Sequence, residues 1–377
     1  MLLKNRNWVY RRISDISEKI IAGGDKPKVF SEMMTDECYI PVYANGVYNN
    51  GLCGYTTIPI VKDECITISA RGTIGFCCVR TTPFTPIVRL IVVIPKSFIS
   101  NKFLCYALSN LNIEKNGGTI PQLTVPMIKE YTIPVPSIEE QSRIVEELDQ
   151  LSSIIEKKRQ QLSELDNLAQ SIFYDMFGDP VTNEKGWEVK KLGDICDISS
   201  SKRIYANEYC EEGVPFYRGK EITEKSKGNE ISVELFISTK KYEELKVKFG
   251  VPKIGDILIT AVGTIGNIWV VNTDEPFYFK DGNVLWLQLK SDIISEYFKF
   301  LLEILIDKHK TSMANGCAYS ALTIINLREM ATNLIPLNLQ QLFAQQIEAI
   351  EKEKELIKQS IKETEELFNS RMDYYFG

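Results

Sequence analysis

The sequence predicts an α+β protein with two similar globular α/β domains, separated by two long antiparallel helices that form a coiled coil, and an internal pseudo-twofold duplication. Two observations predict this architecture. Four sequence segments recur in the same order in the two halves of the chain, and each half ends in a long stretch of heptad-spaced apolar residues. We therefore expect four consecutive regions: globular domain 1 (1–136), helical region 1 (137–178), globular domain 2 (179–336) and helical region 2 (337–377).

The repeated segments keep their order, and the distance between the two copies grows in steps. The matching pairs are residues 7–16 with 186–195 (offset 179), 68–75 with 259–266 (offset 191), Gly117, Leu123, Thr124 and Ile128 with Gly316, Leu322, Thr323 and Leu327 (offset 199), and 174–178 with 373–377 (offset 199). A growing offset is expected when the second copy has gained loop insertions. Four collinear matches indicate a tandem duplication rather than chance similarity.

Each helical region has recognisable start signals. In the first, a short Pro-containing strand at residues 132–136 precedes Ser137, and Glu140 completes a capping-box spacing. Gly178 supplies a stop, because glycine is favoured just beyond a helix end. In the second region, Asn338 and Gln341 occupy the expected capping positions.

Both helical regions carry an apolar ladder with alternating steps of four and three residues, broken at Lys158 in the first and at Lys354 and Arg371 in the second. A seven-residue repeat kept for about five heptads predicts a coiled-coil seam. The seam residues expected to make helix and partner contacts are Ile144, Leu148, Leu151, Ile155, Leu162 and Leu165, then Phe343, Ile347, Ile350, Ile357, Ile361 and Phe368. Antiparallel pairing would place the two globular domains at opposite ends of a rod about 60 Å long. The alternative is two unrelated helices, each docked on its own domain.

The globular halves have mixed patterns. Residues 38–95 are predicted to form short strands broken by turns, and residues 98–112 a short amphipathic helix. Residues 251–289 and 293–306 repeat that order. Both halves are therefore predicted to be α+β units.

Charge is distributed unevenly along the chain. The net charge of −6 argues, taken alone, against a DNA-binding protein. Residues 1–136, however, carry 15 Lys and Arg against 10 Asp and Glu, whereas residues 137–178 carry 4 against 9 and residues 337–377 carry 5 against 8. The negative charge is thus concentrated on the helices, which phosphate would repel and which protein partners suit better.

Several kinds of chemistry are missing from the sequence. It has no G-x-x-x-x-G-K-[ST] phosphate loop, no G-x-G-x-x-G after a strand and no N-P-P-[YF] run. Asp179 with Glu188 and Lys190 resembles a D…E-x-K nuclease pattern, but the first repeat lacks the matching carboxylate. Nine cysteines without C-x-x-C spacing and one histidine, His309, disfavour a zinc site and favour reduced thiols of a cytoplasmic protein. No apolar stretch has membrane-spanning length, and we expect no secretory signal.

Polar, Gly-containing loops of both halves are candidates for contact with DNA. Arg218 could clamp a guanine, Lys220 suits a phosphate, and Asn45 or Asn49 could address adenine. The candidate DNA-binding residues are Tyr43, Asn45, Asn49, Arg71 and Thr73 in the first half and Lys202, Arg203, Tyr217, Arg218, Lys220 and Thr264 in the second. The alternative is that these loops are ordinary hairpin turns.

Together these motifs resemble a known family. The repeated Trp entry segments, the Gly-Thr-Ile-Gly turns, Ile-Pro-Val-Pro-Ser-Ile-Glu-Glu-Gln at residues 133–141 and Phe-Gly-Asp-Pro at residues 177–180 are similar to those of type I restriction-modification specificity subunits. The second helix start departs from the pattern, because it lacks the Glu-Glu-Gln of the first. The recognition domains vary in this family, so no contact residue is carried over.

The resemblance implies a non-catalytic, sequence-specific subunit whose two target-recognition domains each read half of a bipartite double-stranded DNA target. It also implies that the helices set the gap between half-sites and dock two methyltransferase subunits, with up to two restriction/motor subunits completing the complex. This chain would hold no cofactor, since S-adenosylmethionine, ATP and Mg²⁺ would belong to the partners. Two rival functions are a complete nuclease or methylase with its own reader, against which the missing motifs argue, and a purely structural coiled-coil protein.

Overall fold

The computed structural model describes residues 8–111, 122–290, 292–314 and 322–377, except for the side chains of residues 309 and 311–314. The chain divides into two compact units, which are described separately. The first unit comprises Met1–Gln161 with Ile357–Gly377, and the second comprises Leu162–Leu356. Gly117 and Gly316 of the third sequence repeat and the side chain of His309 lie outside the described residues. No helix among the described segments is both long and apolar enough to cross a membrane.

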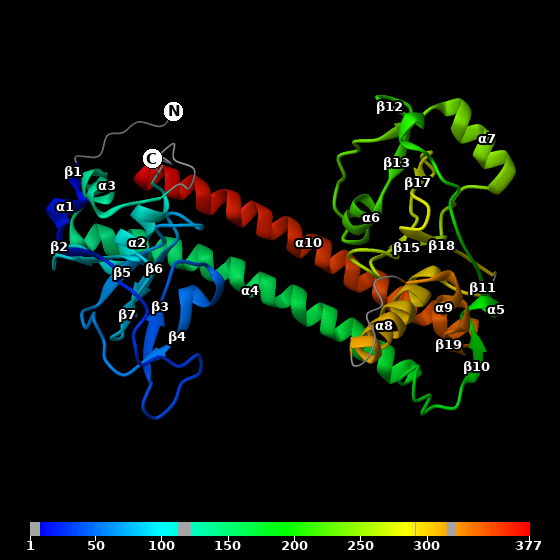
Figure 1. Ribbon diagram of the computed structural model, residues 1–377, viewed down its shortest axis with the longest axis horizontal. Helices are drawn as coiled ribbons and strands as arrows, with labels where there is room; N and C mark the ends of the chain where they lie inside the picture. The colour runs from blue at the N-terminus through cyan, green and yellow to red at the C-terminus, as the bar shows by residue number, and fades with distance from the viewer. Residues whose placement is uncertain (1–7, 112–121, 291, 315–321) are drawn as a thin grey trace. The chain divides into compact units, whose positions relative to one another are not determined.

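The first unit combines three small sheets with short helices (Figure 1). An antiparallel sheet has the order β2-β8-β5-β6, a second sheet has the order β4-β3-β7 with β3 and β7 parallel, and β1 pairs with β9. The elements before the first long helix are β1 (Val9–Arg12), α1 (Ile13–Ile16), β2 (Ser17–Ala22), β3 (Ile40–Tyr43), the 3₁₀ turn η1 (Tyr48–Gly51), β4 (Leu52–Thr56), β5 (Cys65–Ile68), β6 (Cys77–Arg80), β7 (Thr85–Pro86), β8 (Ile91–Pro95), α2 (Asn101–Ser109), α3 (Val125–Glu130) and β9 (Thr132–Val135).

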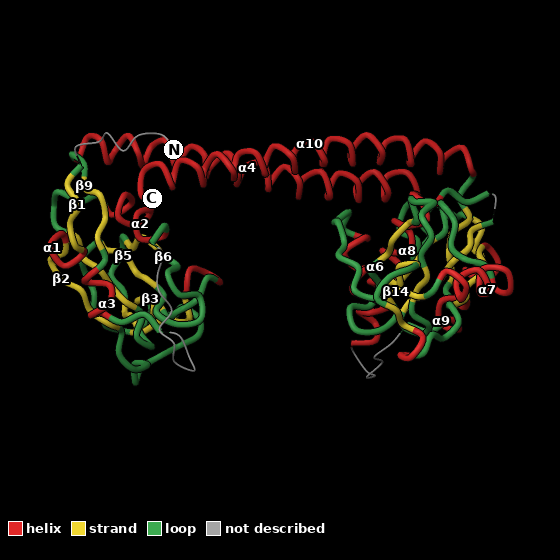
Figure 2. The backbone as a smooth tube through the Cα atoms, turned by 90° about the horizontal axis from the view of Figure 1, so that it is seen from above, coloured by secondary structure: helices red, strands yellow, loops and turns green. Residues whose placement is uncertain are grey.

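The second unit repeats this topology with additions. Its sheets are β11-β18-β15-β16, β12-β14-β13-β17 with β13 and β17 parallel, and β10-β19. Strands lie together within the unit, and short helices surround them (Figure 2). The elements are β10 (Glu188–Lys191), α5 (Leu192–Ile195), β11 (Cys196–Ser200), η2 (Ala206–Glu208), β12 (Tyr209–Cys210), β13 (Val214–Tyr217), α6 (Gly219–Ser226), β14 (Phe236–Ile237), α7 (Thr239–Phe249), β15 (Ile257–Thr260), β16 (Ile268–Val270), β17 (Tyr278–Phe279), β18 (Val284–Leu289), α8 (Ser295–Ala314), α9 (Ile324–Glu329) and β19 (Ala331–Leu334).

The shared strand order confirms the tandem duplication. The second copy gains α6 and α7 between β13 and β15, where the first copy has only a short 3₁₀ turn and β4. Helix α8 has 20 residues, whereas its counterpart α2 has 9. These additions fall where the offset between the copies grows, so the steps in the offset are loop and helix insertions in the second copy.

Two helices of 40 residues each, α4 (Ile138–Phe177) and α10 (Leu337–Phe376), are unbroken along their length (Figure 1). In the first unit, Glu147 of α4 pairs with Arg371 of α10, with Oε2 2.9 Å from Nη2, and Lys158 Nζ donates to Ser360 Oγ at 2.6 Å. Numbers rise along one helix as they fall along the other, so the helices are antiparallel. Because they pack against each other, the alternative of two independently docked helices is wrong.

The same antiparallel pairing occurs in the second unit. Lys354 of α10 forms an ion pair with Asp166 of α4 at 2.8 Å, and the rings of Phe173 and Phe343 are 5.6 Å apart in an edge-to-face contact. Phe343 is fully buried and also packs edge-to-face against Phe177 of α4 and Phe300 of α8. The helix pair is therefore part of the hydrophobic core of this unit and not an appendage to it.

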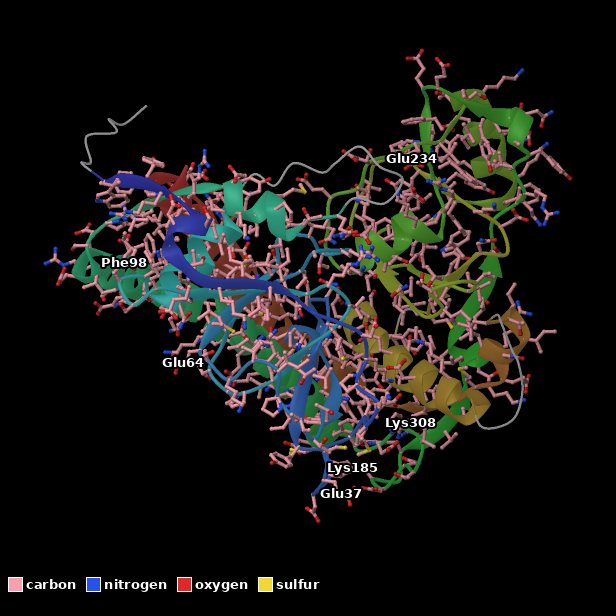
Figure 3. All side chains as sticks on the ribbon, turned by 60° about the vertical axis from the view of Figure 1, so that its left-hand side comes forward. Glu37, Glu64, Phe98, Lys185, Glu234 and Lys308 are labelled. Carbon is pink, nitrogen blue, oxygen red and sulfur yellow. The ribbon has the colours of Figure 1, made fainter. Side chains whose placement is uncertain are left out.

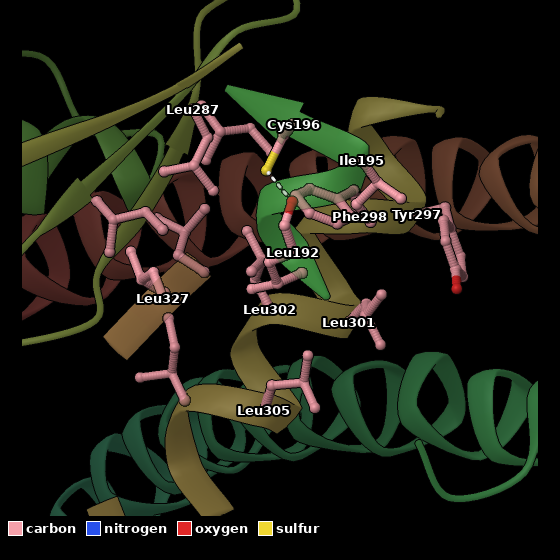
Figure 4. Packing of buried hydrophobic residues seen from close by; sticks show 14 of the residues in the cluster. Leu192, Ile195, Cys196, Leu287, Tyr297, Phe298, Leu301, Leu302, Leu305 and Leu327 are labelled. Atoms are coloured by element: carbon pink, nitrogen blue, oxygen red, sulfur yellow. Dashed lines mark hydrogen bonds between the residues drawn. The ribbon is translucent and has the colours of Figure 1, made fainter. Parts of the chain in front are cut away.

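None of the twelve seam residues is exposed. Five of them, Ile144, Leu148, Phe343, Ile347 and Ile350, belong to the cores of the two units, and the remaining seven are buried or half-buried. Figure 4 shows the core of the second unit, where Leu301, Leu302 and Leu305 of α8 pack with residues of α5 and α9.

The three polar breaks in the ladder each make contacts across the helix pair. Lys158 donates to Ser360 and Thr364, Lys354 pairs with Asp166, and Arg371 pairs with Glu147. A buried or half-buried polar residue favours the one register in which it finds its partner, because any shift would leave it facing apolar side chains. The breaks that weaken the apolar pattern thus specify how the helices align.

The expected capping residue of the second long helix is wrong, although the helix starts where region 2 was predicted to start. Helix α10 begins at Leu337, so Asn338 lies inside it and does not cap it. The start of α10 is instead fixed by Gln340, which is fully buried. Its Nε2 donates to the backbone oxygens of Ile335 (2.8 Å) and Asp292 (3.2 Å), and its Oε1 accepts from the backbone N–H of Ile294 (2.9 Å).

Gln141 makes the same three contacts in the first unit. Its Nε2 donates to the oxygens of Pro136 (3.1 Å) and Phe98 (3.0 Å), and its Oε1 accepts from the N–H of Ser100 (2.9 Å). Gln141 and Gln340 are separated by 199 residues, the offset of the helix repeat. The second helix start therefore retains the glutamine of the Glu-Glu-Gln motif, and each glutamine ties a long helix to the segment before α2 or α8.

Candidate nucleic-acid interface

In the first unit, three turns converge on the side chain of Asn45. Its Oδ1 accepts from the backbone N–H of Ala70 at 2.7 Å, and its Nδ2 donates to the backbone oxygen of Val88 at 2.6 Å. Val88 and its neighbour Arg89 have left-handed φ angles of 53° and 61°, which side-chain-bearing residues rarely adopt. Asn45 was one of two candidates, with Asn49, to address adenine. In the structure both ends of its amide bind backbone groups, Oδ1 at Ala70 and Nδ2 at the strained turn that presents Arg89.

Two arginines of the first unit converge on one acceptor. Arg71 donates to Oε1 of Gln122 from Nε (3.2 Å) and Nη2 (2.8 Å), and Arg89 donates to the same oxygen from Nη1 (3.3 Å). No ion pair between either arginine and a carboxylate occurs among the residues that the structure describes. Two guanidinium groups held close together without a counter-charge form a site that favours an anion.

The other first-unit candidates differ in exposure. Thr73 and Asn49 are exposed, and Asn49 has a left-handed φ of 51° in the 3₁₀ turn. The ring of Tyr43 is covered by the guanidinium of Arg80, 3.6 Å from the ring centroid, and packs edge-to-face against Phe84. Tyr43 therefore supports the loop, whereas Tyr48, which was not predicted, is 90% exposed beside Asn49.

In the second unit, Tyr217 does not belong to the surface. Its side chain is only 6% exposed and stacks on Phe277, with ring centroids 4.9 Å apart. Tyr217 is the last residue of strand β13, in which residues 214, 216 and 217 are buried. Its position next to Arg218 in the sequence therefore did not place its ring on the surface. The expected contact between this ring and DNA is replaced by a role in the core.

Arg218 and Lys220 of the second unit are neutralised by carboxylates. Arg218 Nη2 lies 2.7 Å from Glu221 Oε1 and 2.8 Å from Glu234 Oε2, and Lys220 Nζ lies 2.8 Å from Glu234 Oε1. Hydrogen bonds from Lys220 and Arg218 lower the pKa of Glu234 to about 2. Burial alone would raise the pKa of Glu221, but its hydrogen bonds with Arg218 bring the net value below the ordinary range.

Hydroxyl and amide groups extend this second-unit cluster, which we define as Arg218, Lys220, Thr223, Glu234, Thr264 and Asn267. Thr223 of α6 and Thr264 of the β15–β16 turn have their hydroxyls 3.3 Å apart, and Asn267 Nδ2 donates to Thr223 at 3.1 Å. The remaining candidates make other contacts: Lys202 Nζ lies 4.7 Å from the ring centroid of Phe249, and Arg203 pairs with Asp281 at 2.9 Å.

The nuclease-like pattern is not assembled. Asp179 forms an ion pair with Lys308 (labelled in Figure 3) and accepts the backbone N–H of Val181 at 2.8 Å, whereas Glu188 pairs with Lys190 at 3.4 Å. Although burial would raise the pKa of Asp179, its hydrogen bond with Lys308 keeps the net value low. Within the described parts of the chain, no group of three potential metal ligands occurs.

The long helices expose apolar residues outside the seam. Ile138 and Leu337 are 42% and 40% exposed, and Leu168 and Leu367 are 47% and 50% exposed. Each of these pairs is separated by the helix offset of 199, so the same apolar positions recur on both helices. Exposed leucine and isoleucine at repeated positions on an acidic helix favour two equivalent protein contacts.

Comparison with known proteins agrees with the duplicated architecture. A family described as the type I restriction modification DNA specificity domain matches residues 5–167 and again residues 184–366. A putative type I specificity subunit of Mycoplasma pneumoniae is 35% identical over 138 residues, which cover 36% of this chain and 41% of the relative. The alignment thus spans less than half of that protein.

Two solved structures share the fold. A crystal structure of a type I restriction-modification S subunit from M. genitalium matches with a TM-score of 0.56 and 18% identity, covering 100% of this chain and 98% of that one. A chain from a structure concerned with complex assembly and conformational transition of a type I restriction-modification system matches with a TM-score of 0.60 and 16% identity, covering 98% and 97%.

Proposed function

Because the chain belongs to the type I restriction modification DNA specificity domain family, we propose that it is the DNA-reading subunit of such a system. The observation that carries this proposal is the duplication: two units of the same topology each present a polar cluster of arginines, amides or hydroxyls beside a β-turn that recurs in sequence. Two readers in one chain recognise a bipartite target, and their different side chains make the two half-sites different in sequence.

The two units would read DNA with different chemistry. In the first unit, Arg71 and Arg89 provide a cationic site for a phosphate or a guanine edge, with no carboxylate paired to either in the part of the chain that the structure describes. In the second unit, Arg218 and Lys220 carry the charge, and Thr223, Thr264 and Asn267 supply shorter polar contacts. The paired helices α4 and α10 would set the gap between half-sites, since a stiff coiled coil fixes a distance that a flexible linker does not.

The chemistry of modification would belong to partner subunits. We assign two methyltransferase subunits to the acidic helices, because Ile138 and Leu168 on α4 recur as Leu337 and Leu367 on α10. These partners would bring S-adenosylmethionine, and restriction/motor subunits would bring ATP and Mg²⁺. A solved structure of similar fold comes from work on assembly of a type I system, which supports this arrangement.

Methylome sequencing with and without this gene tests the proposal. A bipartite methylated motif should vanish when the gene is deleted and return when it is restored, because the methyltransferase then loses and regains its targeting subunit. The purified chain, incubated alone with duplex DNA and S-adenosylmethionine, should transfer no methyl groups. Methyl transfer by the chain alone, or an unchanged methylome, would contradict the assignment.

Arg218→Ala should relax the base preference at one position of the second half-site, at a cost of about 1–3 kcal/mol in binding free energy. The planar guanidinium can donate two parallel hydrogen bonds to the edge of a guanine base. Binding to a panel of duplexes with single substitutions measures the effect. Arg143→Ala removes a guanidinium that is 80% exposed on α4 and serves as the control that leaves DNA affinity unchanged.

A further inference from the structure

Glu234 occupies the position in which an anionic ligand would meet the second-unit cluster. Its two carboxylate oxygens are divided between two cations, Oε2 at 2.8 Å from Arg218 and Oε1 at 2.8 Å from Lys220. A DNA phosphate presents two anionic oxygens in a similar geometry and would need the same donors. The carboxylate therefore takes the place of a phosphate in the DNA-free chain.

The backbone around Glu234 is held in place. The carbonyl of the next residue, Leu235, accepts the N–H of Phe216 in β13 at 2.9 Å, and Val233 packs on the aromatic cluster that contains Tyr217. The Glu234 side chain itself, labelled in Figure 3, is 51% exposed. An anchored backbone with an exposed carboxylate allows the side chain to rotate away without unfolding the loop.

Glu221 plays a different part. Its side chain is only 2% exposed, and it accepts both the backbone N–H and the guanidinium of Arg218, closing the start of α6. Glu221 thus positions Arg218 permanently, whereas Glu234 is the carboxylate that can be exchanged. Among the described residues of the first unit, Arg71 and Arg89 instead share the neutral oxygen of Gln122, and no carboxylate pairs with either of them.

We propose that Glu234 is a specificity-determining residue that mimics a DNA phosphate and withholds Arg218 and Lys220 from non-target DNA. This inference rests on the proposed DNA-reading function. In a non-target complex, Glu234 keeps both cations and the second unit contributes little electrostatic attraction. On the target, base contacts by the second unit align the backbone, a phosphate displaces the carboxylate from Lys220, and Arg218 is released to donate to a base edge. The exchange makes the electrostatic gain depend on correct sequence.

Glu234→Gln tests the proposal, because it preserves the shape of the side chain and removes its charge. Binding of the full-length chain to a 30-base-pair non-target duplex and to the target duplex defined by the methylome is measured as a function of salt. For non-target DNA, we expect about tenfold tighter binding at low salt and a plot of log K against log [salt] steeper by about 0.9 for each released cation. The salt slope for the target should stay unchanged, because Glu234 has already left both cations in that complex.

Glu243→Gln is the matched control, since it removes a carboxylate from α7 of the same unit that pairs with Lys246 at 3.6 Å. Identical non-target affinity and slope in Glu234→Gln and the unmodified chain would overturn the proposal, as would an equal gain in the control, which would indicate a simple net-charge effect. If the unmodified chain bound no duplex in a salt-dependent way, the DNA-reading function itself would fail, and that outcome is recognisable before any variant is compared.

Discussion

Deleting one heptad from each long helix, residues 155–161 of α4 together with residues 357–363 of α10, is expected to shorten the DNA gap that the protein accepts while leaving both half-sites unchanged. Seven residues of helix span about 10 Å, which corresponds to about three base pairs of duplex. The two segments face each other, because Lys158 in the first donates to Ser360 in the second. Removing both therefore removes a donor together with its acceptor.

The deletion keeps the seam intact. After the deletion, Leu162 stands four residues after Leu151 in α4, where Ile155 stood before. In α10, Thr364 stands three residues after Lys354, where Ile357 stood before. Both steps belong to the original ladder, so the apolar stripe continues on the same face. The helix-to-domain joints at Gln141 and Gln340 lie outside the deleted segments.

On the original target, the shortened protein should lose about 100-fold or more in affinity, because only one half-site can be contacted at a time and each lost base pair costs about 1–3 kcal/mol. A library of duplexes with both half-sites at varied spacing measures the new optimum. Deleting five residues from each helix is the control: it turns the stripe by about 140° and should break the helix pair. A folded heptad-deletion variant with the original spacing would contradict the proposed role of the helices.

The architecture could be predicted because its signals are local and repeated. The heptad pattern of apolar residues predicts helices α4 and α10, and the four sequence matches in the same order predict the duplication. Their antiparallel pairing was also predictable, since two amphipathic helices in one chain bury their stripes most simply against each other. Even the polar breaks at Lys158 and Arg371 were visible, although their partners were not.

The candidate interface was less predictable, because its decisive contacts join residues far apart in the chain. Nothing near Arg218 in the sequence distinguishes Glu234, 16 residues on, from other surface carboxylates. Arg89 was overlooked because it interrupts an apolar run. The strained turn that exposes it is held by distant residues: Asn45, 43 residues earlier, donates to the Val88 oxygen, and Gly24 and Gly23 accept the N–H groups of Val88 and Arg89. Tyr217 was misplaced because a strand-end aromatic can face the core or solvent, and sequence alternation over four residues does not decide which.

The glutamine joints were missed for a related reason. A glutamine in the first turn of a helix ordinarily faces water, and the two residues on either side of Gln141 are all polar. Its acceptor Phe98 and donor Ser100 are 43 and 41 residues away. The sequence did contain one indication: Gln141 recurs as Gln340 at the helix offset of 199.

Replacing Gln141 or Gln340 by leucine is expected to cost about 3–5 kcal/mol of unfolding free energy. Leucine leaves two backbone oxygens and one N–H without partners in a site that is fully buried, and each unmade bond costs about 1–3 kcal/mol. Because folded proteins are stable by only about 5–15 kcal/mol, this is a large share of the total. Urea unfolding measures the loss, and hydrogen exchange at the start of α4 or α10 identifies which unit is affected.

Glutamate at the same position separates hydrogen bonding from packing. Gln141→Glu keeps the size of the side chain, but an ionised carboxylate cannot donate to the oxygens of Phe98 and Pro136. Burial raises the pKa of the introduced carboxyl in the folded state above its unfolded value near 4.3, so the folded protein holds the proton more tightly. Relative to the unmodified chain, the loss of stability should be smallest below about pH 4.3 and grow as the pH rises toward the folded-state pKa.

Gln345→Leu and Gln345→Glu are the matched controls, since this glutamine is exposed on α10. Both should change the unfolding free energy by less than about 0.5 kcal/mol at any pH, because an exposed side chain keeps its water contacts. If the two Gln141 variants were as mild as these controls, or if Gln141→Glu showed no dependence on pH, the joint would not be held by its hydrogen bonds. The orientation of the first globular domain on α4 would then have to come from apolar contacts such as those of Ile144 and Leu148.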